Sequence, residues 1–105
     1  MPIFILISKH SPENCSMFNA KARKVTLDYF GKSDELMKKH GIKALGGWNV
    51  HTEHVTIGVF EAPSFEAFEK FGMEPEIMAL SEFETYEIKV ATKLEEVTQM
   101  LMQMP

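Results

Sequence analysis

The order in which strand-like and helix-like segments follow one another is the strongest constraint on how this chain folds. Residue type and apolar spacing predict strands at 3–9, 42–50, 55–61 and 83–91, and helices at 16–40, 64–72, 75–80 and 93–103. The two middle strands are joined only by "HTEH", which makes them a hairpin. The order is therefore strand, helix, two paired strands, helix and strand, followed by a terminal helix.

This order has one simple solution in three dimensions. Two strand-helix-strand units with right-handed crossovers place four strands in an antiparallel sheet, with the helices on one face, which is the ferredoxin-like α+β arrangement. The strands at 3–9 and 55–61 are expected to form the central pair. Ser64 is a predicted helix N-cap, Gly41 a left-handed helix end, and Gly46-Gly47 a bulge within a strand.

Length and composition narrow the class of protein. A chain of 105 residues is expected to form a single domain over 1–105, with its core at 3–91. The formal net charge of −4 argues against nucleic acid as a partner, because sequence-independent binding needs a basic surface. The sequence shows no signal peptide, no segment as long as a membrane span, and one cysteine, which cannot form an internal disulfide. A cytoplasmic protein without a membrane partner is expected.

Alternate residues of the predicted strands divide into two sets of different chemistry. One set is aliphatic apart from a tyrosine and is expected beneath the helices: Ile3, Ile5, Ile7, Val55, Ile57, Val59, Tyr86, Ile88 and Val90. The other set mixes aromatic, polar and ionisable residues: Phe4, Leu6, Ser8, His10, His54, Thr56, Gly58, Phe60, Phe83, Thr85 and Glu87. A solvent-facing position would expose the large apolar members of this mixed set as an unusually large patch. A core position would bury its polar members, which is costly without hydrogen-bond partners.

A second protein chain that covers the mixed set resolves both difficulties. The simplest cover is the same face of an identical chain across a two-fold axis, which predicts a homodimer. The space between two such sheets would form a pocket for a small organic ligand. The predicted ligand-binding residues are Ser8, Thr56, Phe60, Thr85 and Trp48.

Three stretches of the sequence resemble a known family. In this strand and helix order, "GIKALGGWNV", "HVTIGVFEAPSFEAFEKF" and "EPEIM" resemble the dimeric α+β barrel superfamily, and in particular its small single-domain members of the GYD type, over residues 3–91. The resemblance implies a dimer with a barrel pocket, and it favours Trp48 as a wall of that pocket over a core position beside Ile57. Trp48 and Asn49 stand where the family has Tyr and Asp. No catalytic residue carries over, and the superfamily hosts many reactions.

The hairpin connection contains the sharpest spacing of metal-binding residue types. If Thr52-Glu53 forms a two-residue turn, His51 and His54 face each other with Cβ atoms roughly 5 Å apart. Two imidazoles at that distance can share a metal ion, with Glu53 or Glu87 as a third ligand. The alternative is a polar hairpin tip in solvent.

A second group of such residues lies in "HSPENCSMF", at the exit of the first strand. His10, Cys15 and Met17 are ligand types for a soft metal such as copper. The alternative assigns Cys15 and Met17 to the start of a helix on the opposite face, so that only His10 belongs to the pocket. We expect this second arrangement, in which His10 and Cys15 share no site.

Three hypotheses about function follow. The leading hypothesis is a homodimer that binds a small organic ligand and, if it is an enzyme, transfers protons through His10 or Glu87 without a cofactor. Burial among aromatic residues would raise the pKa of Glu87 and make it a general base, whereas a surface position would leave it in an ion pair. The second hypothesis is a metal-binding protein that uses His51 and His54 with His10 or Cys15. The third is an assembly or regulatory module without catalysis.

Overall fold

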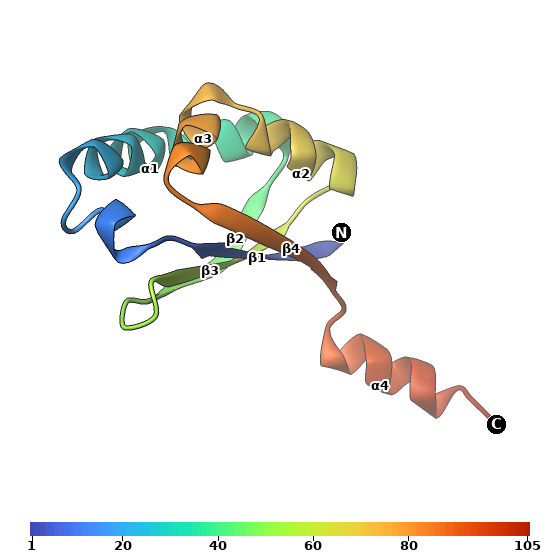
Figure 1. Ribbon diagram of the computed structural model, residues 1–105. Helices are drawn as coiled ribbons and strands as arrows, with labels where there is room; N and C mark the ends of the chain where they lie inside the picture. The colour runs from blue at the N-terminus through green and yellow to red at the C-terminus, as the bar shows by residue number, and fades with distance from the viewer.

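A computed structural model describes residues 1–105 and shows one four-stranded antiparallel sheet, in the order β2-β3-β1-β4, with α1, α2 and α3 on one side (Figure 1). The strands are β1 (Ile3–Lys9), β2 (Lys43–Val50), β3 (Val55–Glu61) and β4 (Thr85–Ala91), and the helices are α1 (Ala20–His40), α2 (Phe65–Gly72), α3 (Pro75–Met78) and α4 (Leu94–Met102). Two short 3-10 turns, Pro12–Asn14 and Ala79–Glu82, complete the chain. The predicted ferredoxin-like α+β class is confirmed, with β1 and β3 at the centre.

Local sequence signals account for the ends of the helices. The Asn19 side chain caps α1 by accepting a hydrogen bond from the Ala22 amide at 3.0 Å, so the helix begins later than the apolar spacing predicted. Residues 16–18, which were predicted to be helical, form a turn instead. Gly41 ends α1 in the left-handed conformation, with φ of 69°. The Ser64 hydroxyl caps α2 by accepting from the Ala67 amide at 3.1 Å.

The helices cover the β1 and β3 members of the mixed set, so the face predicted for these two strands is wrong. Phe4 is 2% exposed, and its ring stacks on that of Phe68 in α2 with a centroid separation of 5.1 Å. The core cluster joins this sheet face to α1 and α2: Phe4, Leu36, Ile42, Ala62, Phe68 and Phe71. Large aromatic side chains from both layers fill the space between the sheet and the helices. We call this side of the sheet the covered face.

The register of β4 also differs from the prediction. Ser8 pairs with Tyr86 and Leu6 with Ile88, so Tyr86 and Ile88 lie on the covered face. Ile7 pairs with Glu87, which places Glu87 and Thr85 on the other side. Residues opposite each other in an antiparallel pair share a face, but the sequence of an isolated strand does not say which of its two faces meets which face of its neighbour.

The other side of the sheet, the open face, has no helix over it (Figure 1). It carries the aliphatic residues of the two central strands: Ile3, Ile5, Ile7, Val55, Ile57 and Val59. Trp48 pairs with Ile57 and therefore belongs here, 60% exposed. Its ring lies over Gly46, where an added Cβ would come within 2.6 Å of Trp48 Cη2. The predicted bulge is present as a register shift between Ala44 and Gly46.

The C-terminal helix α4 extends away from the rest of the chain, on the side of the open face (Figure 1). Its apolar side chains are largely exposed, with Leu94 82% and Met102 79% accessible. This helix therefore gains little stability from contacts within its own chain. None of the helices combines the length and the apolar character that crossing a membrane requires.

Candidate functional site

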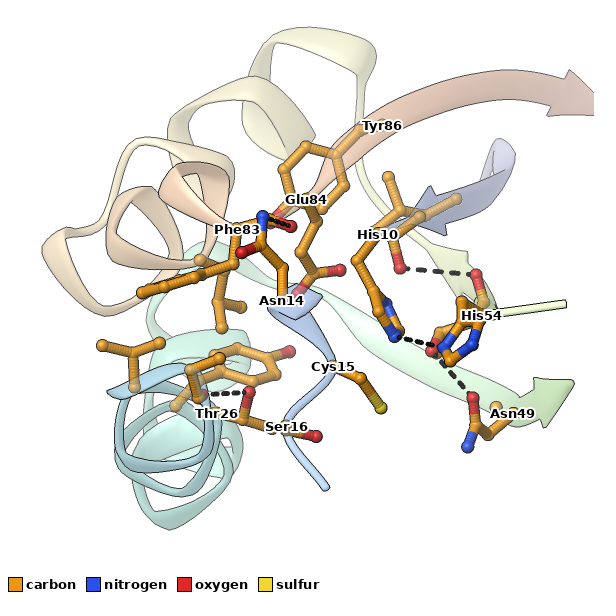
Figure 2. A pocket seen from close by; sticks show the side chains of 18 of the residues that line it. His10, Asn14, Cys15, Ser16, Thr26, Asn49, His54, Phe83, Glu84 and Tyr86 are labelled. Carbon is orange, nitrogen blue, oxygen red and sulfur yellow. Dashed lines mark hydrogen bonds between the residues drawn. The ribbon is translucent and has the colours of Figure 1, made fainter. Parts of the chain in front are cut away.

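A cavity of about 510 Å³ lies between the covered face and α1 (Figure 2). Its walls come from all four strands, from α1 and from the segment 77–84, and most are apolar, among them Leu6, Tyr29 and Phe60. The β1 and β3 residues that were predicted to line a pocket between two sheets therefore line a cavity within one chain. A volume of this size is within the range of small-molecule sites in proteins.

Ser8 and Glu84 form a polar patch on the strand side of this cavity. Ser8 is 6% exposed, and its hydroxyl lies 3.5 Å from the carbonyl oxygen of Thr56. The same hydroxyl also favours the ionised form of the Glu84 carboxylate. Because a hydroxyl has one proton, it can donate to only one of these two acceptors at a time.

Burial perturbs the acidic groups of the cavity. Loss of solvent raises the pKa of Glu84 above its usual range, and the Ser8 hydroxyl opposes that increase. Burial likewise raises the pKa values of Tyr29 and Tyr86, and the neighbouring Glu84 charge raises the Tyr86 pKa further. The cavity therefore offers two phenol hydroxyls and a carboxyl group that binds a proton more readily than a carboxyl group in water.

Two histidines and the cysteine converge at one end of the cavity (Figure 2). His10 Nε2 lies 3.3 Å from His54 Nδ1, and the rings meet edge to face at an interplanar angle of 74°. The ligand atoms of His10, Cys15 and His54 all lie within 4.8 Å of one another. Burial lowers the pKa of His10, and the charge of His54 lowers it further. The neutral form of His10 is therefore favoured.

The turn before α1 holds Cys15 in this position. The Cys15 amide donates to the carbonyl oxygen of Pro12 at 3.2 Å, and its own carbonyl accepts from the Asn19 amide at 2.8 Å. The Asn14 side chain donates to the carbonyl of Phe83 at 3.4 Å, which ties the turn to the segment before β4. The thiol is free and buried, with 6% of the residue exposed.

The hairpin positions His54 through an unusual backbone conformation. His54 has φ of 56°, the only positive value outside glycine, and its carbonyl accepts from the His10 amide at 3.1 Å. Histidine is one of the residue types enriched in this left-handed region, which still disfavours side chains with a Cβ. Such conformations tend to gather at functional sites.

The structure brings several predicted site residues together and separates others. Ser8, His10, His54, Thr56 and Phe60 all border the cavity. His51 also borders it but does not join the group of close ligand atoms, which contains His54, His10 and Cys15. The expectation that His10 and Cys15 share no site is therefore wrong, because the turn folds Cys15 back towards the end of β1.

Three predicted ligand-binding or catalytic residues do not point into the cavity. Thr85 and Glu87 lie on the side of the sheet without helices, as predicted, but the β1 and β3 residues with which they were grouped lie on the covered face. Trp48 borders the cavity, but its register with Ile57 and its contact with Gly46 place its ring on the open face. A hairpin loop with an even number of residues puts Trp48 on the same face as Ile57. Strand alternation alone would therefore have predicted this position correctly.

Sequence reasoning missed the acidic side of the site. Glu84, Tyr86 and Tyr29 border the cavity, and none was a candidate. The alternation of β4 contained the signal for Glu84 and Tyr86, since these residues share one parity. The signal could be used only once the pairing of Ser8 with Tyr86 was known.

Comparisons with known proteins identify the fold alone. No family model matches the chain, and no curated protein matches it. Among solved structures, the chain is similar to that of an uncharacterised NIPSNAP domain protein from Burkholderia xenovorans, with a TM-score of 0.52 and 8% sequence identity. The match covers 88% of this chain and 95% of that one. At this identity the likeness supports the ferredoxin-like fold and no activity.

Proposed function

We propose that this protein binds a small, mainly apolar organic molecule in the cavity between the covered face and α1. The observation that supports this best is the cavity itself, about 510 Å³ in volume, with mostly apolar walls and a few converging polar groups. Apolar walls contribute affinity by removing ligand surface from water, and the polar groups fix its orientation.

The polar groups on the cavity wall indicate what kind of polar group the ligand carries. Glu84, Ser8 and His10 provide hydrogen-bond donors and acceptors along one side, opposite the apolar residues of α1. A ligand with one carbonyl, hydroxyl or amine group at the end of an apolar body matches this arrangement. Full burial of a second charged group would be costly without a partner.

Proton transfer is the chemistry that these residues could add to binding. Glu84 replaces Glu87 as the candidate general base, because Glu84 borders the cavity and its pKa is raised by burial. His10 borders the same cavity and is the second candidate. A cofactor-free enzyme that moves a proton on its ligand is therefore the catalytic form of this proposal.

A cavity-filling substitution tests the binding proposal. Thr26 lies on the cavity wall in α1 and donates to the Ala22 carbonyl at 2.8 Å, while Thr98 in α4 makes the same bond to Leu94 at 2.9 Å away from the cavity. Thr26→Phe should abolish the fluorescence increase of an apolar dye such as Nile red, and Thr98→Phe should retain it. Dye binding that is equal in both variants would contradict the proposal.

We also propose a second copy of this chain as the partner of the open face. The aliphatic residues of that face and the exposed apolar residues of α4 lie on the same side of the sheet (Figure 1). A two-fold axis would cover both sheets at once and let each α4 pack against the other chain. The same interface would serve an assembly or regulatory protein without catalysis.

A further inference from the structure

The group formed by His10, Cys15 and His54 is the strongest feature that ligand binding does not explain. The cavity would be as large and as apolar without a thiol and two imidazoles at its end. These residues are brought together from the end of β1, the turn before α1 and the hairpin before β3. Their ligand atoms lie within 4.8 Å of one another, although the residues are up to 44 positions apart in the chain.

We propose that His10, Cys15 and His54 bind one Zn²⁺ ion through Nε2, Sγ and Nδ1, with the fourth ligand position open to the cavity. Zinc bound by four ligands is tetrahedral, and bonds of roughly 2.0–2.1 Å to nitrogen place two nitrogen ligands about 3.3 Å apart. The separation of His10 Nε2 and His54 Nδ1 is 3.3 Å. The two imidazoles therefore already have the spacing of zinc ligands.

The thiol needs only a small movement to complete the group. Cys15 Sγ lies within 4.8 Å of one ring nitrogen of each histidine, and a tetrahedral site with a Zn–S bond of roughly 2.3 Å requires about 3.6 Å. On binding, the Zn–S bond replaces the S–H bond and the thiol proton passes to solvent. The backbone hydrogen bonds of Cys15 hold its Cα in place, so this movement is confined to the side chain.

The donor atoms decide the class of metal. Two neutral imidazoles and a thiolate suit Zn²⁺ and disfavour Mg²⁺ and Ca²⁺, which bind oxygen ligands. Three protein ligands beside a cavity leave a position for water or for a ligand atom, as in catalytic zinc sites. The proposal goes beyond the binding of an organic molecule, which needs no metal, and the dye experiment above tests that binding separately.

Cobalt provides a direct readout of this arrangement. Titration of the purified 105-residue chain with Co²⁺ should give a thiolate-to-cobalt charge-transfer band and the intense visible bands of a tetrahedral site, and saturate at one equivalent. Excess Zn²⁺ should remove both. Cys15→Ser should lose the charge-transfer band because it lacks the sulfur. Circular dichroism of Cys15→Ser checks that the buried serine has not unfolded the chain.

A pair of variants in one hairpin isolates the contribution of His54. His54→Asn removes the imidazole with a residue that tolerates the left-handed backbone, and His51→Asn makes the same change outside the group. In competition with a chromophoric chelator, His54→Asn should weaken Zn²⁺ binding at least about tenfold, because even the outer partners of metal ligands contribute that much. His51→Asn should leave the affinity unchanged.

Three results would overturn the proposal. The first is a Co²⁺ titration without bands in the folded wild-type chain, which would leave the two histidines as a hydrogen-bonded pair. The second is equal loss of zinc affinity in His51→Asn and His54→Asn. The third is tight binding of Cu⁺ by a chain that takes neither Co²⁺ nor Zn²⁺, which would assign the site to copper.

Discussion

The covered face and the open face of the sheet use opposite kinds of side chain. The covered face combines aromatic rings with Ser8, Thr56 and Glu84, and it encloses a cavity. On the open face the central strands present aliphatic residues, among them Ile5, Ile57 and Val59, and no helix covers them. The edge strand β4 adds Thr85 and Glu87 to this face. A purely apolar strand face therefore does not identify the side on which a protein's own helices pack.

The two faces also differ in which side chains are compatible with their burial. A face beneath helices can retain polar groups where a cavity and hydrogen bonds satisfy them, as Ser8 shows. A face that meets another chain loses its contact with water on association, and aliphatic residues without hydrogen-bonding groups suit that change. We infer that the covered face serves the ligand and the open face serves assembly.

The largest effect is expected from a charge on the open face. In Ile57→Asp, each chain would place an uncompensated carboxylate in the interface, at a cost of several kcal/mol per buried charge. Sedimentation should show a dimer for the wild type and a monomer for Ile57→Asp at the same concentration. A wild-type monomer, or an Ile57→Asp variant that still dimerises, would contradict the inference that the open face is a dimer interface.

The next effect concerns packing on the covered face. Phe4→Ala removes a ring that is 2% exposed and stacked on Phe68, and should lower the free energy of unfolding by about 3–5 kcal/mol. Ile5→Ala on the open face should cost clearly less when both are measured by urea denaturation in the monomeric Ile57→Asp background. Equal costs would mean that helices or α4 cover both faces.

The smallest effect concerns two glutamates on opposite faces. Because burial raises the pKa of Glu84 in the folded chain, its ionisation destabilises the fold as pH rises from below the unfolded value through the folded one. Glu84→Gln, which keeps the shape of the side chain without its charge, should therefore be more stable than the wild type at pH 7 and similar to it at pH 4.

Glu87→Gln is the matched control for that experiment. Glu87 is exposed on the open face of the single chain, and in the monomeric Ile57→Asp background its substitution should change the free energy of unfolding by less than about 0.5 kcal/mol at both pH values. Thermal unfolding across this pH range measures both variants. A pH-dependent gain in Glu87→Gln, with none in Glu84→Gln, would reverse the assignment of these residues to their faces.

The sequence allowed the elements and their order to be predicted, because these depend on local signals. The caps at Ser64 and Gly41 and the bulge beside Gly46 are properties of a few neighbouring residues. The strand order then followed from general rules of connection. The N-terminus of α1 was misplaced because apolar spacing continues through the turn that Asn19 ends.

The covered face and the site depended on contacts between distant segments. The pairing of Ser8 with Tyr86 decides that Glu84, and not Glu87, borders the cavity, and a slip of one residue would exchange them. The approach of Cys15 to His54 depends on a turn and a hairpin that are far apart in the chain. Neither the strand pairing nor the approach of Cys15 to His54 can be predicted from the spacing of residues along one segment.

The most direct test of the account is the set of proton contacts made by each face in solution. In a nuclear Overhauser spectrum that selects contacts within one chain, the Phe4 ring should show contacts to the Phe68 ring, whose centroid is 5.1 Å away. The methyl groups of Ile5 and Ile57 should show none to α1 or α2. Contacts from those methyl groups to Phe68, with none from Phe4, would contradict the account.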